Sequence, residues 1–154
     1  MDIQKEAKYQ AAKFLKSNHI MVLASISENL EPEAATVYYV SDDDFNLFFM
    51  TSAKSRKAEN LKINGKVAFV IGRGPEIITI QGGGVAKELP AREAETFYEL
   101  IKTTALSNAT QWPILKLAEE GYCTFKIEPS WMTYFNLDNK NHSDIASEEF
   151  YKII

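Results

Sequence analysis

Apolar residues recur at two different spacings along the chain. Between residues 3 and 17 they return every three or four positions while lysines take the other faces, which is typical of an amphipathic helix. After Asn18, runs of β-branched and aromatic residues alternate with short polar breaks, which is typical of strands. The predicted strands are residues 20–26, 33–40, 45–50, 66–72, 76–81, 122–127 and 131–135.

Helix signals lie between these strands. Ser55 can cap a short helix over residues 55–64, and Asn64-Gly65 supplies a left-handed stop. Because proline is tolerated in the first turn of a helix, further helices are expected to open at Pro90 and Pro113.

Turn and break signals complete the pattern. The aspartates at 42–44 predict a tight solvated turn, which we favour over a metal site. The glycines at 82–84 predict a bulge or sharp bend, after which the strand continues to Leu89, and strands that bend in this way close barrels. Residues 136–154 are polar at first and are expected to form a loosely held tail.

The order of these elements predicts the fold class. A helix, three antiparallel strands, a short helix, further strands, a helix and final strands fit a predominantly antiparallel α+β barrel. A parallel nucleotide-binding sheet would instead alternate strands with helices. Since no repeat, linker or low-complexity segment interrupts the chain, residues 1–154 are expected to form a single domain.

Composition and charge exclude several classes of function. The net charge is −4 and no long basic run occurs, so nucleic acid is not an expected partner. No apolar segment has the length of a signal peptide or a membrane span, and we expect a cytoplasmic protein. Cys123 is the single cysteine, and with only His19 and His142 beside it neither a disulfide nor a metal cluster is expected. His19 is expected to cap the first helix.

One segment carries the chemistry. Residues 48–57 run from a hydrophobic strand directly into hydroxyl groups and cations at the start of a helix, where free amides and the helix dipole favour an anion. The side chains that can donate to a phosphate monoester there are Thr51, Ser55, Arg56 and Lys57. The alternative is that Ser55 only caps the helix while Arg56 and Lys57 face water.

Four segments carry a resemblance to a known family. Residues 35–39, 49–51, 55–57 and 81–86 are similar to pieces of the pyridoxamine 5′-phosphate oxidase-related, FMN-binding split-barrel family. The resemblance implies a six- to seven-stranded split β-barrel with flanking helices and a bound FMN. The cofactor-binding residues that it implies are Thr36, Val37, Tyr38, Tyr39, Met50, Thr51, Ser55, Arg56, Lys57, Gln81, Trp112 and Trp131.

The resemblance also implies how these residues are used. In the family the flavin phosphate is held by the residues that match 55–57, and the ring lies along the strand that matches 36–39, near Thr51. The family forms homodimers with each flavin at the subunit interface, so residues of a partner subunit complete the site. The candidates for that role, with simple packing as the alternative, are Gln111, Trp112 and Trp131.

The sequence departs from the family's namesake enzyme in ways that bear on function. Ala35 and Val40 stand where true pyridoxamine phosphate oxidases have basic residues, and the closing tryptophan-arginine signature is absent, so vitamin B6 oxidation is not expected. The leading hypothesis is an FMN-dependent oxidoreductase that takes electrons from a nicotinamide and reduces a small molecule. No catalytic residue is assigned, because tyrosines such as Tyr38 and Tyr134 more often pack than donate protons.

Two alternatives stay open beside that hypothesis. The first is a non-enzymatic flavin-binding or stress-response module. The second is a haem- or deazaflavin-binding protein, because one fold serves several cofactors. Haem would need an axial ligand such as His19, His142 or a tyrosine.

Overall fold

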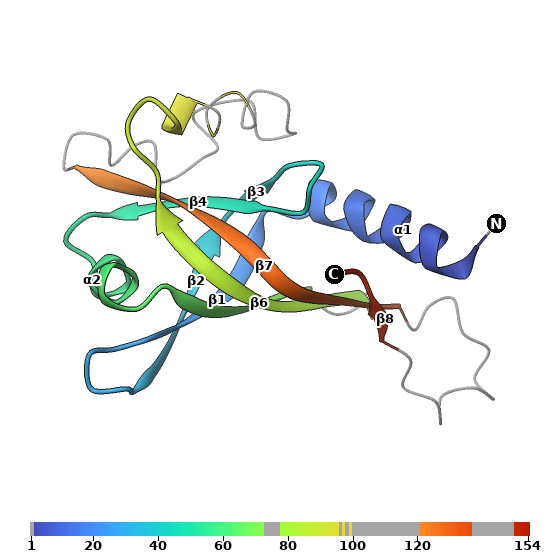
Figure 1. Ribbon diagram of the computed structural model, residues 1–154, viewed down its shortest axis with the longest axis horizontal. Helices are drawn as coiled ribbons and strands as arrows, with labels where there is room; N and C mark the ends of the chain where they lie inside the picture. The colour runs from blue at the N-terminus through green and yellow to red at the C-terminus, as the bar shows by residue number, and fades with distance from the viewer. Residues whose placement is uncertain (1, 73–77, 96, 98, 100–120, 137–149) are drawn as a thin grey trace.

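The computed structural model describes residues 2–72, 78–95, 97, 99, 121–136 and 150–154. Within them, helices α1 (Ile3–Ser17) and α2 (Arg56–Ile63) flank one antiparallel sheet, as Figure 1 shows. Its strands are β1 (Ile20–Ile26), β2 (Pro32–Tyr38), β3 (Val40–Ser41), β4 (Leu47–Ser52), β5 (Lys66–Ile71), β6 (Ile78–Glu88), β7 (Tyr122–Asn136) and β8 (Tyr151–Lys152).

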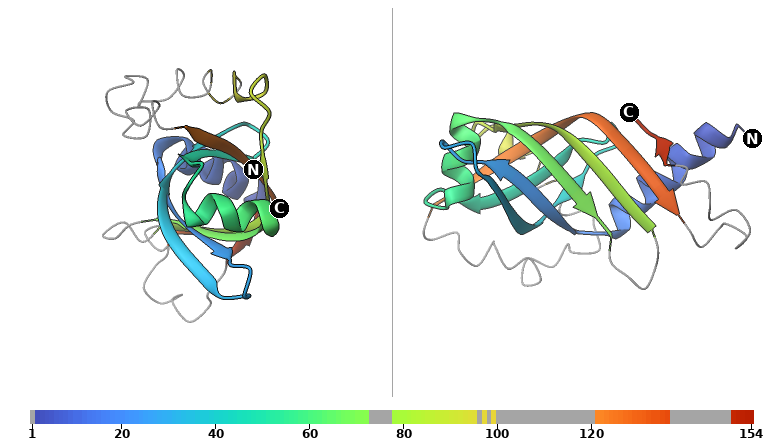
Figure 2. Two further views of the ribbon diagram at one scale, coloured as in Figure 1. Left: turned by 90° about the vertical axis from the view of Figure 1, so that its left-hand side faces the viewer. Right: turned by 90° about the horizontal axis from the view of Figure 1, so that it is seen from below.

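The sheet curls into a barrel that is not fully closed. Its main path runs β2-β1-β5-β6-β7-β4-β3, and β8 pairs with β7. Strands β2 and β4 come into contact, but no ladder joins them in the described part of the chain. Helix α2 lies across one end of the barrel and α1 projects from the opposite end (Figure 2). The predicted antiparallel α+β split barrel is therefore confirmed, and the split lies between β2 and β4.

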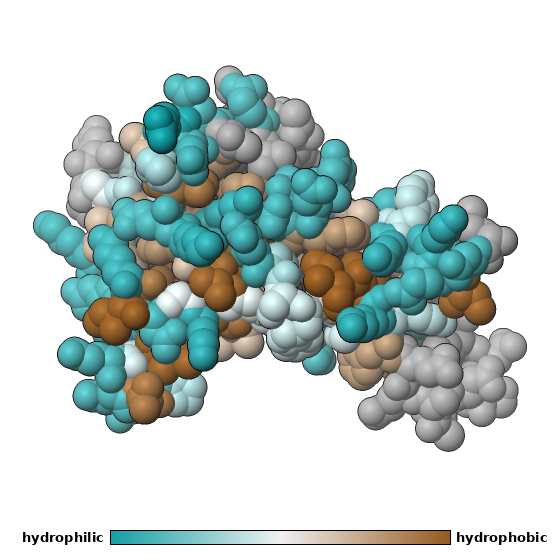
Figure 3. All heavy atoms as spheres, viewed as in Figure 1, coloured by the Kyte–Doolittle hydropathy of each residue, from teal (hydrophilic) through white to brown (hydrophobic). Residues whose placement is uncertain are grey.

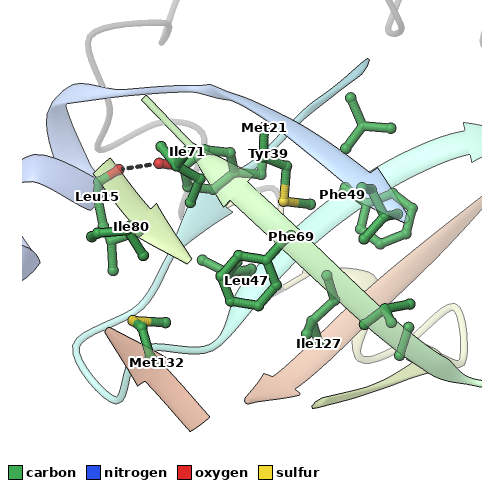
Figure 4. Packing of buried hydrophobic residues seen from close by; sticks show 14 of the residues in the cluster. Leu15, Met21, Tyr39, Leu47, Phe49, Phe69, Ile71, Ile80, Ile127 and Met132 are labelled. Carbon is green, nitrogen blue, oxygen red and sulfur yellow. Dashed lines mark hydrogen bonds between the residues drawn. The ribbon is translucent and has the colours of Figure 1, made fainter. Parts of the chain in front are cut away.

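Apolar side chains from alternate strand positions fill the barrel (Figure 4). The rings of Phe49 and Phe125 stack with centroids 5.4 Å apart, and Phe69 is 2% exposed. The Tyr39 hydroxyl donates a hydrogen bond of 3.0 Å to the Leu15 carbonyl, which ties the end of α1 to the core. Burial raises the pKa of Tyr39, so the hydroxyl keeps the proton that this bond needs.

One long strand replaces two predicted ones near the C-terminus. We expected a break at Pro129, but β7 runs unbroken through it, so that prediction is wrong. Proline is tolerated because it lies at a bulge: Gly83 pairs with Trp131 and Gly84 with Pro129, which leaves Ser130 as the extra residue. The Ser130 hydroxyl donates to the Gly83 carbonyl at 3.3 Å. The bend predicted at the glycines of β6 is confirmed.

Two strand boundaries also differ from the prediction. The strand expected over residues 33–40 is divided into β2 and β3 at Tyr39, whose backbone N–H donates to the His19 carbonyl at 2.9 Å. The next strand begins only at Leu47, because the Asp42 carboxylate accepts hydrogen bonds from the backbone N–H groups of Asp44 and Asn46 and extends the acidic turn. In the described ranges, no group of three acidic, histidine or cysteine side chains could hold a metal ion.

Both helices end differently from the prediction. Asn18 caps α1, since its N–H and its side-chain amide both donate to a carbonyl of the last turn, and the expectation that His19 does so is wrong. Helix α2 begins after the Ser55 cap as predicted but ends at Asn64 with φ −139°, so the left-handed stop is also wrong. Gly65 is needed for a different reason: a Cβ there would lie 2.6 Å from the Ala86 carbonyl oxygen.

The C-terminal residues belong to the barrel. Strand β8 pairs with β7, and Ile153 is 2% exposed, so the end of the predicted tail is held in the sheet. A helical turn begins at Pro90 as expected, while residues 100–120, with the helix predicted at Pro113, and residues 137–149 lie outside the described residues. No described helix has the length and apolar character needed to cross a membrane.

Candidate functional site

A pocket of about 210 Å³ opens beside the split of the barrel, at the end that α2 covers. Its walls come from the end of β1, the first half of β2 and the start of α2. The residues that line it are Ser25, Glu33, Ala34, Ala35, Ser55, Arg56 and Lys57. Since Ser55, Arg56 and Lys57 are the last three residues of the predicted phosphate segment, the pocket lies where the sequence indicates an anion.

Two hydroxyl groups and an ammonium group form a cluster at this pocket. The hydroxyl oxygens of Thr51 and Ser55 are 3.1 Å apart, and Lys57 Nζ donates to Thr51 Oγ1 at 3.3 Å. Ser55 Oγ also accepts the backbone N–H of Ala58 at 3.1 Å, so one side chain both caps α2 and faces the cluster. This geometry joins the end of β4 to the start of α2.

The electrostatics of the cluster favour an anion. Lys57 is half-buried, and desolvation lowers the pKa of its ammonium group. None of the ion pairs in the described part of the chain includes Lys57. The cation stands beside the N-terminal end of α2, whose free amides and dipole also attract negative charge. An oxyanion is the chemical group that satisfies all of these donors.

A polar group that we did not predict lies in the same pocket. Glu33 Oε2 accepts a hydrogen bond of 3.0 Å from Asn60 Nδ2, and the same oxygen is 3.9 Å from Arg56 Nε. Asn60 is 7% exposed and its amide also reaches Ser25 Oγ at 3.4 Å. The alternation of β2 could have revealed Glu33, because it shares the inward face of the strand with the buried Val37.

Other predicted site residues lie on the outer face of the sheet. Two cross-strand rows cover β2, β1, β5, β6 and β7 there, and we name them together the uncharged outer face. The rows are Thr36, Val22, Val70, Gln81 and Thr133, then Ala34, Ala24, Ala68, Gly83 and Trp131. The exposed fractions of Val22, Val70 and Trp131 are 47%, 43% and 44%.

The remaining predicted residues do not reach the pocket with their side chains. Val37 and Tyr39 are buried in the barrel core, and Met50 packs in a second cluster on the other face of β4 with Phe97. Tyr38 is half-buried against that second cluster. The predictions for Gln111, Trp112 and His142 fall outside the described residues. The structure thus brings Thr51, Ser55, Arg56 and Lys57 together, whereas Val37 and Tyr39 have only backbone atoms to offer.

His19 is poorly placed to be a haem ligand. Both of its ring nitrogens are shielded from solvent, and neither has a hydrogen-bond partner among the residues that the structure describes. Desolvation is the main cause that lowers the pKa of His19 below 6.5. An axial ligand must present a nitrogen lone pair to the iron, which this conformation does not allow.

Because the ring nitrogens of His19 are shielded, we expect the folded protein to lose stability in acid. Both folded and unfolded states carry neutral His19 at about pH 8, whereas below about pH 6.5 the unfolded chain gains a proton that the folded chain resists. The free energy of unfolding should therefore decrease as the pH is lowered, and this group contributes at most about 1.4 kcal/mol per pH unit. Urea denaturation of the wild type and of His19→Leu at about pH 8 and about pH 5.5 measures the difference. Equal acid sensitivity of both proteins would contradict this role. Protonation of His142 does not affect the comparison, because both proteins contain this residue.

Fold and pocket together define a split-barrel protein with a pocket, lined in part by Arg56 and Lys57, beside the split. A family model described as pyridoxamine 5′-phosphate oxidase matches residues 7–135, and the chain belongs to this family. No curated protein matches the chain in sequence.

Solved structures share the fold at low sequence identity. General stress protein 26 from Bacillus anthracis is 20% identical, with a TM-score of 0.63 over 88% of this chain and 95% of that one. An FAD-binding protein from Mesorhizobium loti is 21% identical, with a TM-score of 0.63 over 82% and 90% of the two chains. The haem storage protein HutZ from Vibrio cholerae is 16% identical, with a TM-score of 0.65 over 84% and 94%. These neighbours support the fold, and two of them are described with different ligands, FAD and haem.

Proposed function

We propose that this chain is a flavin-binding protein and that the pocket beside α2 holds the phosphate of FMN. The observation that carries the proposal is the half-buried Lys57, which shares a hydrogen-bonded cluster with Thr51 and Ser55 and takes part in none of the described ion pairs. A phosphate oxygen accepts from ammonium and hydroxyl donors together, and an uncharged ligand would leave the ammonium unpaired. Family membership and a solved neighbour described as FAD-binding support a flavin.

The isoalloxazine ring is proposed to lie along β2, beyond the pocket. Thr36 is exposed on the outer face of this strand, two positions past Ala34, which lines the pocket. Residues 36–39 can then contribute backbone groups, and Thr36 and Tyr38 can contribute side chains. When bound, the ring supplies the redox chemistry, and the protein's part is to position it and to exclude water.

The uncharged outer face is proposed to be covered by a second copy of this chain. Its two rows contain ten residues and no charged side chain, which is unusual for a solvent-exposed protein surface. Figure 3 shows apolar side chains exposed among hydrophilic ones on the side where β6 and β7 face the viewer in Figure 1. Thr36 and Gln81 belong to this face, so a homodimer would enclose the proposed ring site between subunits.

With flavin bound, the activity that we propose is the reduction of a small molecule with electrons from a nicotinamide. A non-enzymatic flavin module, as in a stress response, would bind flavin equally well and show no turnover. A deazaflavin shares the phosphate and polyol chemistry, whereas haem is supported only by the fold of neighbours such as HutZ. Vitamin B6 oxidation is disfavoured because Ala35 and Val40 offer no positive charge.

Three readouts on the purified protein test the proposal. Absorption bands of FMN that remain after gel filtration, at near-equimolar ratio, would support the flavin site, and a colourless protein would refute it. Oxidation of NADH or NADPH by the FMN-loaded protein, followed at steady state, separates the enzyme from the non-enzymatic module. Light scattering during the same gel filtration gives the mass, and a monomer in the flavin-bound state would refute the shared site.

A further inference from the structure

A carboxylate lines the pocket that otherwise favours an anion. Glu33 lies in the same 210 Å³ pocket as Arg56 and Lys57, so the lining carries two positive charges and one negative charge. A phosphate that enters the pocket therefore meets a group of its own sign. Two groups of like charge in one pocket repel, and this repulsion lowers affinity to the extent that solvent does not screen it.

Glu33 cannot easily withdraw from the pocket. Its side chain is only 27% exposed, and its Oε2 accepts from the amide of Asn60, which is itself 7% exposed. Asn60 is held in turn against Ser25 Oγ. The buried amide therefore fixes the position of the carboxylate, and rotation into water would leave a buried donor unpaired.

Glu33 also reduces the positive charge that Arg56 offers. The distance of 3.9 Å from Arg56 Nε to Glu33 Oε2 makes a loose ion pair, and the guanidinium is largely exposed. An incoming phosphate would have to share this guanidinium with the carboxylate. Lys57 takes part in no such pair among the described residues, so the two cations are unequal.

We propose that Glu33 is a specificity-determining residue, a fixed internal competitor that lowers the affinity of the pocket for phosphate and keeps a phosphorylated cofactor exchangeable. This inference rests on the proposed phosphate site and deepens it. Because the competition is between charges, it acts on ligands in proportion to their charge at this position. Riboflavin, which lacks the phosphate, is insensitive to it.

The substitution Glu33→Gln tests the inference by removing the charge and keeping the shape. The new amide oxygen can still accept from Asn60 Nδ2, so the pocket should keep its structure. Fluorescence titrations with FMN and riboflavin measure both affinities. We expect FMN to bind roughly tenfold more tightly than to the wild type and riboflavin to be unchanged. The control Glu31→Gln removes the same charge from an exposed position outside the pocket and should change neither affinity.

The affinities of Glu33→Gln for the two flavins show whether Glu33 acts on the phosphate through its charge. Unchanged or weaker FMN binding by Glu33→Gln would overturn the inference, and equal losses for both flavins would make Glu33 a structural or hydroxyl-binding residue. If the wild type binds no flavin, the proposed function fails and inorganic phosphate becomes the probe. Phosphate should then raise the melting temperature of Glu33→Gln more than that of the wild type, and equal shifts would overturn the inference.

Discussion

Replacing Lys57 by methionine is expected to weaken FMN binding by roughly 10- to 100-fold, and riboflavin binding hardly at all. Lys57 is the half-buried cation that donates to Thr51 Oγ1, and it is absent from the described ion pairs, so its positive charge is open to a phosphate. Methionine keeps the length of the side chain and removes the charge. Titration of both flavins against the variant measures the two affinities.

The neighbouring Lys54 provides a matched control. It carries the same charge three residues earlier, is exposed and does not line the pocket, so Lys54→Met should leave both affinities near those of the wild type. The unliganded Lys57→Met protein should be at least as stable as the wild type, because the substitution removes a desolvated charge. Equal effects of the two substitutions on FMN would contradict the assigned phosphate site.

The substitution Gly84→Ala is expected to destabilise the fold by about 3 kcal/mol or more. A Cβ on Gly84 would lie 2.1 Å from the Glu128 carbonyl oxygen and 2.7 Å from Pro129 Cα. Both atoms belong to the backbone of β7 at the bulge, so no side chain can turn aside to make room. The free energy of unfolding in urea measures the loss.

The adjacent glycine is the control for that prediction. A Cβ on Gly83 would lie 2.5 Å from Trp131 Nε1, which belongs to a side chain that is 44% exposed and can rotate. Gly83→Ala should therefore cost about 1 kcal/mol. If both alanine variants lose the same free energy, the backbone contact at Gly84 is not what requires glycine there.

The sequence predicts those features of the fold that depend on neighbouring residues. The alternation of β1, the Ser55 cap and the glycine bend of β6 follow from local preferences, and the structure has each of them. Pro129 misleads because its missing N–H matters only in a regular ladder, and the bulge at Ser130 depends on how β7 pairs with the distant strand β6. The local pattern likewise gives no sign that β8 pairs with β7.

Some residues of the candidate site are likewise predictable from the local sequence, and others are not. Thr51, Ser55 and Lys57 lie within one short segment, so their juxtaposition is predictable from the turn between β4 and α2. Glu33 and Ser25 reach the same place through Asn60, which is 27 and 35 residues away from them. Tyr39 shows a different limit of prediction. The family resemblance implies that it contacts the cofactor, whereas its hydroxyl donates to the Leu15 carbonyl in the core.

The proposed phosphate site is tested most directly by the affinities of the wild-type protein for FMN and for riboflavin, measured by fluorescence titration under the same conditions. We expect FMN to bind in equimolar amount and at least about tenfold more tightly than riboflavin, because its phosphate reaches Lys57, Thr51 and Ser55. Equal affinities for the two flavins, or no binding of FMN, would contradict it.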